Sequence, residues 1–232
     1  MLFKKATKIY HWILDLIFPR FCLNCNAEGV WLCPKCQKLI PIYNQKCCAI
    51  CNRKTINYLC NKCRETTHLD HLIIITNYDH PLVSYLIHTY KYQFIQEISE
   101  IIAQMMLKKI KKIAFYYFTL VPVPLHHKRF RWREFNQAEL IAKIIGHHLE
   151  IDINRKLLKR IKNTKPQAKI TNPSERKKNI TGAFAVNRKE TLPERVILLD
   201  DVGTTFGTLT ECAKTLKKVG VKEILAIVFA KG

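Results

Sequence analysis

The sequence predicts an α/β protein, in which a parallel sheet with helices on both faces follows a small metal-binding module. Apolar strands and amphipathic helices alternate from His71 onward, and this order is typical of parallel sheets. Four Cys-x-x-Cys pairs lie before that point. The 232 residues, 48% of them hydrophobic, suffice for one such domain and an appendage. We expect an amphipathic helix in residues 1–20, the module in 21–70 and the α/β domain in 71–232.

The first segment is expected to be an amphipathic helix rather than a signal peptide or a membrane span. Three lysines precede the apolar run Ile9 to Phe18, which itself carries His11 and Asp15. Pro19 and Arg20 follow where a signal peptide would have small residues. No stretch approaches the ~18–20 apolar residues that cross a bilayer. The sequence therefore indicates a protein that is not integral to a membrane.

The paired cysteines predict two zinc sites. Each Cys-x-x-Cys turn points two sulfurs to one side and offers half of a tetrahedral thiolate site. Nearest pairing gives two sets of ligands: Cys22, Cys25, Cys33 and Cys36, then Cys48, Cys51, Cys60 and Cys63. A cross-braced pairing and iron–sulfur clusters are the alternatives. Cys47 is a spare that could replace Cys48, and Cys212 suits a small core position in a helix.

The same cysteine spacing bears on the compartment and on the role of the module. Cysteines spaced for metal rather than for disulfides favour a reducing, cytoplasmic setting. Because the module contains little apolar sequence, metal would supply most of its folding free energy. A structural role is favoured over direct contact with nucleic acid.

Strands and helices are expected in strict alternation within the α/β domain. The expected strands cover residues 72–75, 118–123, 196–199 and 224–229, and the expected helices 98–113, 137–149 and 209–219. Asn136 and Glu139 have the pattern of a capping box, and Gly220 is expected to end the last helix. Ligands of such sheets bind at the carboxyl ends of the strands.

The turn that follows residue 199 has the pattern of a sugar-phosphate site. It reads Asp200, Asp201, Val202, Gly203, Thr204, Thr205, Phe206, Gly207 and Thr208. Two adjacent carboxylates can accept hydrogen bonds from a vicinal diol such as ribose O2 and O3. The helix that follows offers free backbone N–H groups and a dipole that favour a phosphate. A plain Asp-Asp turn of a Rossmann-like or receiver domain is the structural alternative.

The charge balance favours polyanionic partners. The chain carries 39 Lys and Arg against 18 Asp and Glu, a formal net charge of +21. Nucleic acid is the usual partner of such a chain, and a merely basic surface is the alternative. The cations concentrate in residues 155–189, at Lys108 to Lys112 and in the aromatic-rich segment His126 to Arg133. This last mixture suits a single strand and equally a pyrophosphate pocket.

Several of these motifs resemble the ComF (ComFC) family of competence and DNA-utilisation proteins. The acid–threonine turn is similar to the motif by which type I phosphoribosyltransferases bind phosphoribosyl pyrophosphate (PRPP). Pro122 to Leu125 and Arg133 to Gln137 resemble the family's PVPL and RGFNQ stretches, and His88 to Tyr92 its short KY segment. Residues 160–184 resemble a further stretch of the family, and the paired cysteines resemble its double zinc ribbon. The resemblance covers nearly the whole chain.

The resemblance implies a type I phosphoribosyltransferase-like sheet and a cytoplasmic protein of natural transformation that binds PRPP with Mg²⁺ and single-stranded DNA. Asp200 and Asp201 would hold the ribose diol, with residues 202–208 around the 5′-phosphate. The pyrophosphate loop would comprise Leu125, His126, His127, Lys128, Arg129 and Arg133. Asp200, Asp201 and Arg133 would be the catalytic residues, and 160–182 a lid. DNA-uptake machinery at the inner membrane is an implied partner.

Two departures from the family pattern leave other functions open. Phe206 and Glu134 stand where the family generally carries Gly, and the side chain of Phe206 must turn outward or it blocks the phosphate. One alternative is an active phosphoribosyltransferase for an unidentified base or nucleotide. The other is a zinc-ribbon scaffold with a vestigial PRPP site.

For the histidines and for one aromatic run, structural roles are considered beside functional ones. His126 and His127 are expected to be solvated loop residues, and His147 and His148 surface or packing residues of a helix. The run Tyr90 to Tyr92 suits either base stacking or covering of the core, and the sequence does not separate the two.

Overall fold

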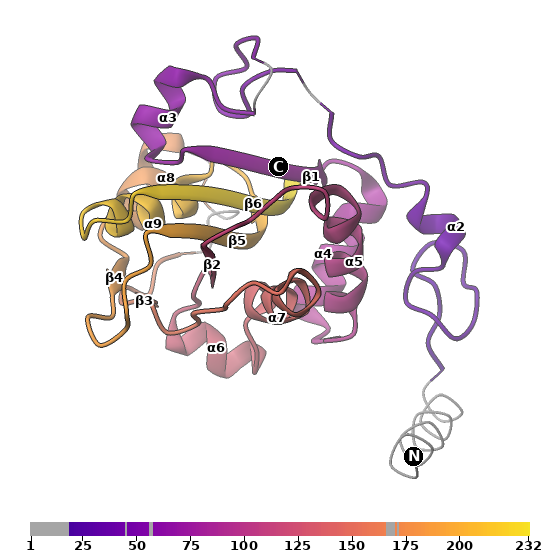
Figure 1. Cartoon of the computed structure of the whole chain (residues 1–232). Helices are drawn as coiled ribbons and strands as arrows, with labels where there is room; N and C mark the ends of the chain where they lie inside the picture. Colours follow the sequence, from indigo (N-terminus) through magenta and orange to yellow (C-terminus); the bar gives the residue numbers. More distant parts are fainter. Residues whose placement is uncertain (1–18, 45, 56–57, 166–169, 171) are drawn as a thin grey trace.

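A four-stranded parallel sheet forms the centre of the molecule (Figure 1). The computed structural model describes residues 19–44, 46–55, 58–165, 170 and 172–232. The strands are β1 (His71–Asn77), β2 (Phe118–Pro122), β5 (Arg195–Gly203) and β6 (Glu223–Lys231), in the spatial order β1-β6-β5-β2. All neighbours run parallel, which confirms the predicted sheet. Residues 1–18 of the expected first helix lie outside the described residues.

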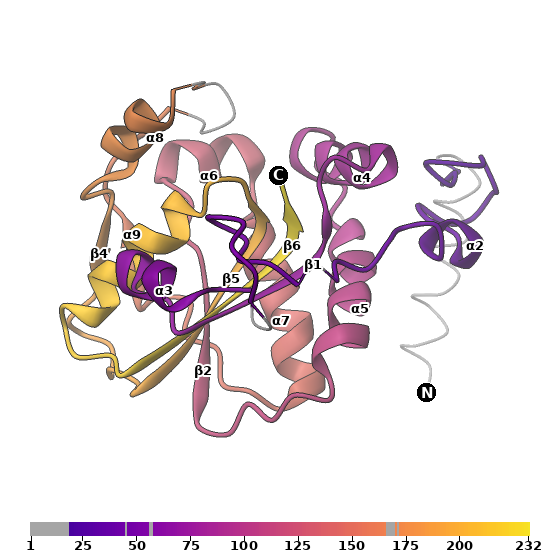
Figure 2. The ribbon, with the colours of Figure 1, turned by 90° about the horizontal axis from the view of Figure 1, so that it is seen from above.

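Both faces of the sheet are covered, and for this reason its strands are apolar along their whole length. On β5, Val196 and Leu198 face one core while Ile197 and Leu199 face the other. Helices cover the two faces as predicted (Figure 2). They are α4 (Pro81–Tyr92), α5 (Ile98–Ile110) and α7 (Gln137–Leu149) on one face, and α9 (Gly207–Lys217) and the short α3 (Asn61–Thr67) on the other.

The predicted elements occur close to their expected limits, with two differences. β5 continues through Asp200 and Asp201, so the acid pair belongs to the strand and not to a turn. α7 begins after Asn136 as expected, and the Asn136 side chain accepts a hydrogen bond from a first-turn N–H at 3.2 Å. The capping box is not completed, because Glu139 forms ion pairs with Lys143 and Arg155 instead.

Other elements are not foreseen by periodicity. The basic segment expected as a loop forms helix α6 (His127–Arg133). β3 (Leu158–Arg160) and β4 (Phe184–Val186) pair antiparallel beside the main sheet and bracket α8 (Pro173–Ile180). These pieces are too short for a hydrophobic period to identify them.

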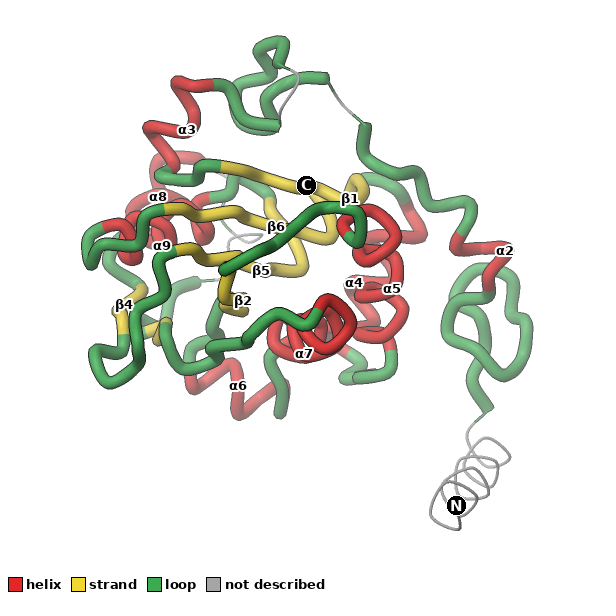
Figure 3. Tube along the Cα trace, viewed as in Figure 1, coloured by secondary structure: helices red, strands yellow, loops and turns green. Residues whose placement is uncertain are grey.

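The cysteine-rich region consists mostly of loop, with α2 (Pro34–Gln37) and α3 as its helices (Figure 3). The segment around α2 lies on the side of α4 and α5, and the segment before α3 lies beyond the sheet edge formed by β1 (Figure 1). Within the described ranges, no helix combines the length and apolar character needed to cross a bilayer.

Candidate functional site

Two four-cysteine clusters form in the nearest pairing that the sequence predicts. The sulfurs of each set lie within 4.8 Å of one another. The sulfurs of Cys25 and Cys33 are 3.7 Å apart, and those of Cys51 and Cys60 are 3.6 Å apart. Zinc–sulfur bonds of ~2.3 Å give tetrahedral sulfur–sulfur edges of about 3.8 Å. Each cluster could therefore hold a zinc ion, and the cross-braced pairing is excluded.

The remaining two cysteines lie outside these clusters. Cys47 forms a β-bridge with Lys54, so Cys48 is the cluster member, as in the predicted ligand set. Cys212 is fully buried in α9, which confirms its prediction as a small core residue. Backbone N–H groups of the first module also point at sulfur: that of Cys33 donates to Cys22 Sγ at 3.3 Å.

Lys109 of α5 joins the second cysteine segment to the sheet. Its Nζ donates to the carbonyl oxygens of Tyr43 and Ile74, both at 2.6 Å, and to the hydroxyl of Tyr58 at 2.9 Å. The same ammonium group lies 5.0 Å from the centre of the Tyr58 ring. Of the lysines clustered at 108–112, Lys109 is therefore not available to a polyanion, because its donors are used inside the molecule.

The acid pair lies at the carboxyl end of β5, beside the segment that follows β2. The N–H of Val123 donates to the carbonyl of Leu199 at 2.9 Å, and this bond places the two segments side by side. The Asp200 side chain accepts from the N–H of Asp201 at 2.9 Å. Asp201 forms an ion pair with Lys91 of α4 at 3.0 Å, and these two side chains are only 8% and 20% exposed.

The two carboxylates have different electrostatic surroundings. Burial, reinforced by the negative charge of Asp201, raises the pKa of Asp200 to about 7, and Lys91 opposes this shift. Lys91 compensates the charge of Asp201 through the ion pair. Below about pH 7 the protonated form of Asp200 is therefore favoured, so the pair carries less negative charge than two ionised carboxylates would.

The threonine loop after β5 encloses a hollow of about 110 Å³. No side chain of the described residues caps the first turn of α9, so its backbone N–H groups stay available next to the hollow. Phe206 precedes this turn with a left-handed φ of 55° and is 3% exposed.

The ring of Phe206 does not turn outward into solvent; it packs into the core on the α9 face of the sheet, and Phe206 also lines the hollow. The ring lies against Gly203, where an added Cβ would meet a ring carbon at 2.4 Å. Gly203 thus leaves the space that the ring of Phe206 fills.

A cavity of about 150 Å³ joins the acid pair to the basic segment. Its polar lining includes Arg129, Arg133, Asn136, Gln137, Arg160, Asp200, Asp201 and Thr208. The Nε atoms of Arg133 and Arg160 and the Nε2 atom of Gln137 are buried and have no hydrogen-bond partner among the described residues. Such buried donors are rare in proteins. The cavity therefore suits an anion with several acceptor oxygens.

The arginines of this cavity are held in place by neighbouring groups. Arg129 and Arg160 each donate to Thr164, one to its carbonyl and one to its hydroxyl oxygen, both at 2.5 Å. Arg133 donates to Gln137 Oε1 at 3.1 Å. Burial lowers the pKa of Arg129 to about 10, and the charges of Arg160 and Arg133 add to this effect. An anion bound between these guanidinium groups would relieve their repulsion.

The predicted pyrophosphate loop lies only partly at this cavity. Leu125, Arg129 and Arg133 line it, whereas His127 and Lys128 are exposed on α6. His126 is 6% exposed, and its Nδ1 accepts from the N–H of Lys128 at 3.3 Å as the cap of α6. Its prediction as a solvated loop residue is therefore wrong.

Glu134 is not among the residues that line the cavity. It is exposed and ends α6 with a φ of 63°, a conformation in which glycine is common. His147 and His148 are exposed in the last turn of α7, as predicted.

Some residues at the cavity or beside its acid pair have no site role in the sequence analysis. Lys91 pairs with Asp201, Gln137 offers an unused donor, and Arg160 lines the cavity instead of serving only in a lid. The KY and RGFNQ resemblances contain the first two and were the available signal. In the run left open between stacking and core, Tyr90 is fully buried and donates to the Gln137 carbonyl at 3.0 Å. Tyr92 lies under the Arg133 guanidinium.

Fold and clusters together define a class of protein in which a parallel α/β domain is joined to two four-cysteine metal-binding clusters. No family model matches the chain. It is 33% identical over 217 residues to competence protein F of Haemophilus influenzae, and the match covers 88% of this chain and 93% of that protein. The chain therefore belongs to the competence protein F family, which confirms the resemblance seen in its motifs.

Other relatives carry related names. The chain is 25% identical to competence protein ComFC of Streptococcus pneumoniae, over 90% of this chain and 91% of that protein. It is 26% identical to the DNA utilization protein YhgH of Salmonella typhimurium, over 88% of this chain and 85% of that protein.

Proposed function

We propose that this chain is a cytoplasmic protein of DNA uptake that binds PRPP with Mg²⁺ and also binds single-stranded DNA. The observation that carries the proposal is the cavity in which Arg129, Arg133 and Arg160 face Asp200 and Asp201. Pyrophosphate is bound well by converging guanidinium groups, and a ribose diol by paired acceptor oxygens. The unused donors at this cavity are those that such a ligand would satisfy.

In this proposal the ligand lies across the carboxyl end of the sheet. Asp200 and Asp201 hold the ribose hydroxyls, the loop Val202 to Thr208 holds the 5′-phosphate, and the three arginines meet the pyrophosphate. Mg²⁺ prefers oxygen ligands and keeps several waters, so it would bind together with the pyrophosphate. A type I phosphoribosyltransferase-like fold for residues 71–232, with 160–182 as a lid, belongs to the same proposal.

The DNA half of the proposal rests on charge and on the relatives. Two relatives are named for competence and another for DNA utilisation, and the net charge of +21 suits a polyanion. Arg160, from the most basic part of the chain, already lines the cavity. Contact with DNA-uptake machinery at the inner membrane, and zinc as a structural ion in the module 21–70, complete the proposal.

Calorimetric titration with Mg-PRPP tests the site directly. We expect saturable binding that requires Mg²⁺, and a loss of about 10- to 100-fold in affinity for Arg133→Gln, since hydrogen bonds from a charged donor contribute about 1.5–3 kcal/mol. Lys128→Gln is the matched control, because it removes one charge from the same helix at an exposed position. Its affinity should stay within about twofold of the wild type.

The outcomes separate the alternatives. If Mg-PRPP neither binds nor raises the melting temperature of the wild type, the site is vestigial and the scaffold function replaces this one. If both variants lose affinity equally, general charge and not the cavity is responsible.

An active phosphoribosyltransferase is the second candidate. The observation in its favour is the raised pKa of Asp200, since a group that titrates near neutral pH can transfer a proton. This candidate requires pyrophosphate release in the presence of an acceptor, and the release should vanish in the paired change Asp200→Ala and Asp201→Ala. Binding without release would leave the PRPP-binding function as the activity.

A further inference from the structure

A second pocket lies at the opposite edge of the sheet from the acid pair. It has a volume of about 390 Å³ and is lined by the first residues of three strands, His71, Phe118 and Glu223, and by Tyr58, Arg64 and Phe115. The amino and carboxyl ends of parallel strands lie at opposite edges, so this pocket is separate from the cavity proposed for PRPP. Its volume is within the range of sites for small organic ligands.

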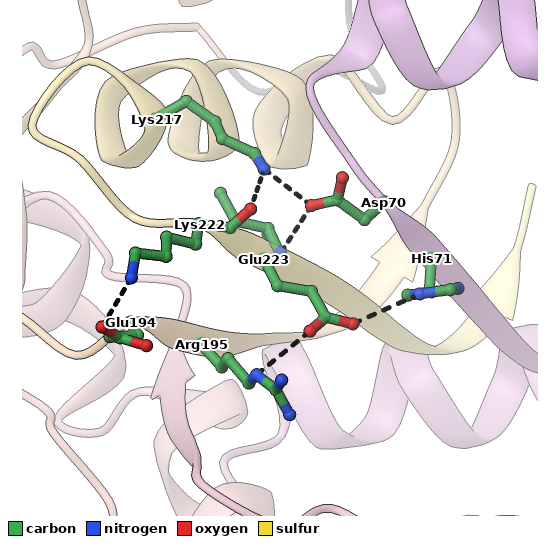
Figure 4. Close-up of polar contacts among 8 residues, drawn as sticks. Asp70, His71, Glu194, Arg195, Lys217, Lys222 and Glu223 are labelled. Atoms are coloured by element: carbon green, nitrogen blue, oxygen red, sulfur yellow. Dashed lines mark hydrogen bonds and ion pairs between the residues drawn. The ribbon is translucent and has the colours of Figure 1, made fainter.

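The walls of the pocket are aromatic and its acids are already paired. The rings of Phe115 and Phe118 meet edge to face with centres 6.5 Å apart, and the Tyr58 ring adds a third aromatic surface. Glu223 is held by His71 at 3.4 Å and by Arg195 at 3.3 Å (Figure 4). These contacts compensate the carboxylate on the rim, and the three rings share the lining with aliphatic side chains such as Leu59, Leu72 and Ile113.

Asp70, at the same rim, is equally well compensated. Its carboxylate accepts from Lys217 Nζ at 2.8 Å and from the N–H of Ile224 at 2.7 Å (Figure 4). In contrast, the buried Nε of Arg64 has no hydrogen-bond partner among the described residues. Because Arg64 also lines the pocket, its guanidinium group can offer donors to an acceptor atom on the edge of a planar ligand.

Two highly exposed tyrosines lie next to the pocket residues in the sequence. Tyr116 and Tyr117 lie in the chain between the two phenylalanines of the pocket, and their exposures are 74% and 89%. Tyr117 has a left-handed φ of 64°, a conformation that costs a residue with a side chain about 1–2 kcal/mol. Rings so exposed contribute little to folding, and the exposed Lys111 and Lys112 stand a few residues before them.

We propose that this pocket binds a nucleobase, with Arg64 donating to a base oxygen or nitrogen and Tyr116 and Tyr117 stacking the neighbouring bases. Aromatic stacking is the usual way to hold unpaired bases, and lysines beside the rings follow the phosphates. The base comes from a single strand or from a free nucleoside, which share this chemistry. The proposal deepens the DNA half of the proposed function and is independent of the PRPP cavity.

Binding of a labelled thymidine oligonucleotide of about 12 nucleotides, a length within the site sizes of single-strand binders, tests the stacking. We expect the double variant Tyr116→Ala and Tyr117→Ala, and separately Phe115→Ala, to raise the Kd about fivefold or more. An abasic strand of equal length should bind the wild type and these variants with equal affinity. Tyr85→Ala, at a 47% exposed position on α4, is the matched control and should leave both affinities unchanged.

Photocrosslinking locates the contact independently. Strands with 5-iododeoxyuridine are expected to crosslink within residues 113–118. Crosslinks confined to other segments, or equal losses for the thymidine and abasic strands, would overturn the pocket assignment. Melting curves identify any variant whose loss reflects unfolding, and such a variant is replaced by Tyr117→Asn, which suits the left-handed backbone.

An experiment with a free nucleoside distinguishes failure of the pocket assignment from failure of the DNA half of the proposed function. If the wild type binds no strand, the DNA half of the proposed function fails, and saturation-transfer NMR with thymidine then decides the pocket. A thymidine signal that disappears in Phe115→Ala supports the pocket, and the lack of any signal rejects it. Mg-PRPP affinity should be the same in all these variants, because none of the changed residues lies at the other cavity.

Discussion

Replacing Lys109 by Met tests how the second cysteine segment is attached to the sheet. Met retains a long apolar side chain and removes only the ammonium group. The change deprives the carbonyl oxygens of Tyr43 and Ile74 of a donor bound at 2.6 Å. Ile74 belongs to β1 and Tyr43 precedes the second cluster, so these two bonds connect the module with the sheet.

The magnitude follows from the bonds that are lost. A hydrogen bond from a charged donor contributes about 1.5–3 kcal/mol, and bonds that share one donor group are not additive. With the further bond to Tyr58 at 2.9 Å, we expect the free energy of unfolding to fall by about 3–5 kcal/mol. That is a large fraction of the ~5–15 kcal/mol that stabilises an ordinary domain.

Urea unfolding of the zinc-loaded protein in reducing buffer, followed by circular dichroism, measures this loss. Lys108→Met is the control, because Lys108 is the exposed neighbour on the same helix. Its effect should stay within about 0.5 kcal/mol. Unfolding free energies for the two variants that agree within this margin would refute the assigned role of Lys109.

Two further predictions concern the acid pair and the loop behind it. The pKa of Asp200 is raised from 3.8 to about 7, so between these values the folded state holds a proton that the unfolded state has lost. This stabilises the fold at low pH and is lost as the pH rises toward 7. Asp200→Asn should therefore gain stability over the wild type between about pH 5 and 7, by at most about 1.4 kcal/mol per pH unit; a constant difference between their unfolding free energies would contradict the shift. Gly203→Ala brings a Cβ to 2.4 Å from the Phe206 ring and should cost about 1–3 kcal/mol. In a Phe206→Gly background the same change should cost about half as much or less, and equal costs would show that the ring does not fill that space.

Local patterns made much of this fold predictable. Cys-x-x-Cys turns fix two sulfurs through a few backbone angles, and short loops then bring neighbouring pairs together, so nearest pairing was correct. The apolar run Val196 to Leu199 predicted a strand that is buried on both faces. The cap at Asn136 is likewise a local interaction.

Contacts between segments that are distant in the sequence could not be predicted. Lys91 and Asp201 are far apart along the chain, and the tertiary fold brings them to 3.0 Å from each other. Lysine is usually found at the surface, yet three acceptor atoms from other segments surround the side chain of Lys109. Phe206 was required to turn outward to leave room for a phosphate, and the space beside Gly203 accommodates its ring in the core instead. Tertiary contacts therefore determine where each of these side chains lies.

The cysteine clusters touch different halves of the hydrophobic interior. Cys22, Cys33 and Cys36 belong to the half that contains α5 and α7, and Cys48 and Cys63 to the half that contains α9. Oxidation of a sulfur in one cluster would loosen the layer next to it and leave the other layer clamped by its own ion. If each cluster holds zinc, the molecule would then lose order in two separate stages, each set by the oxidation of the sulfurs of one cluster.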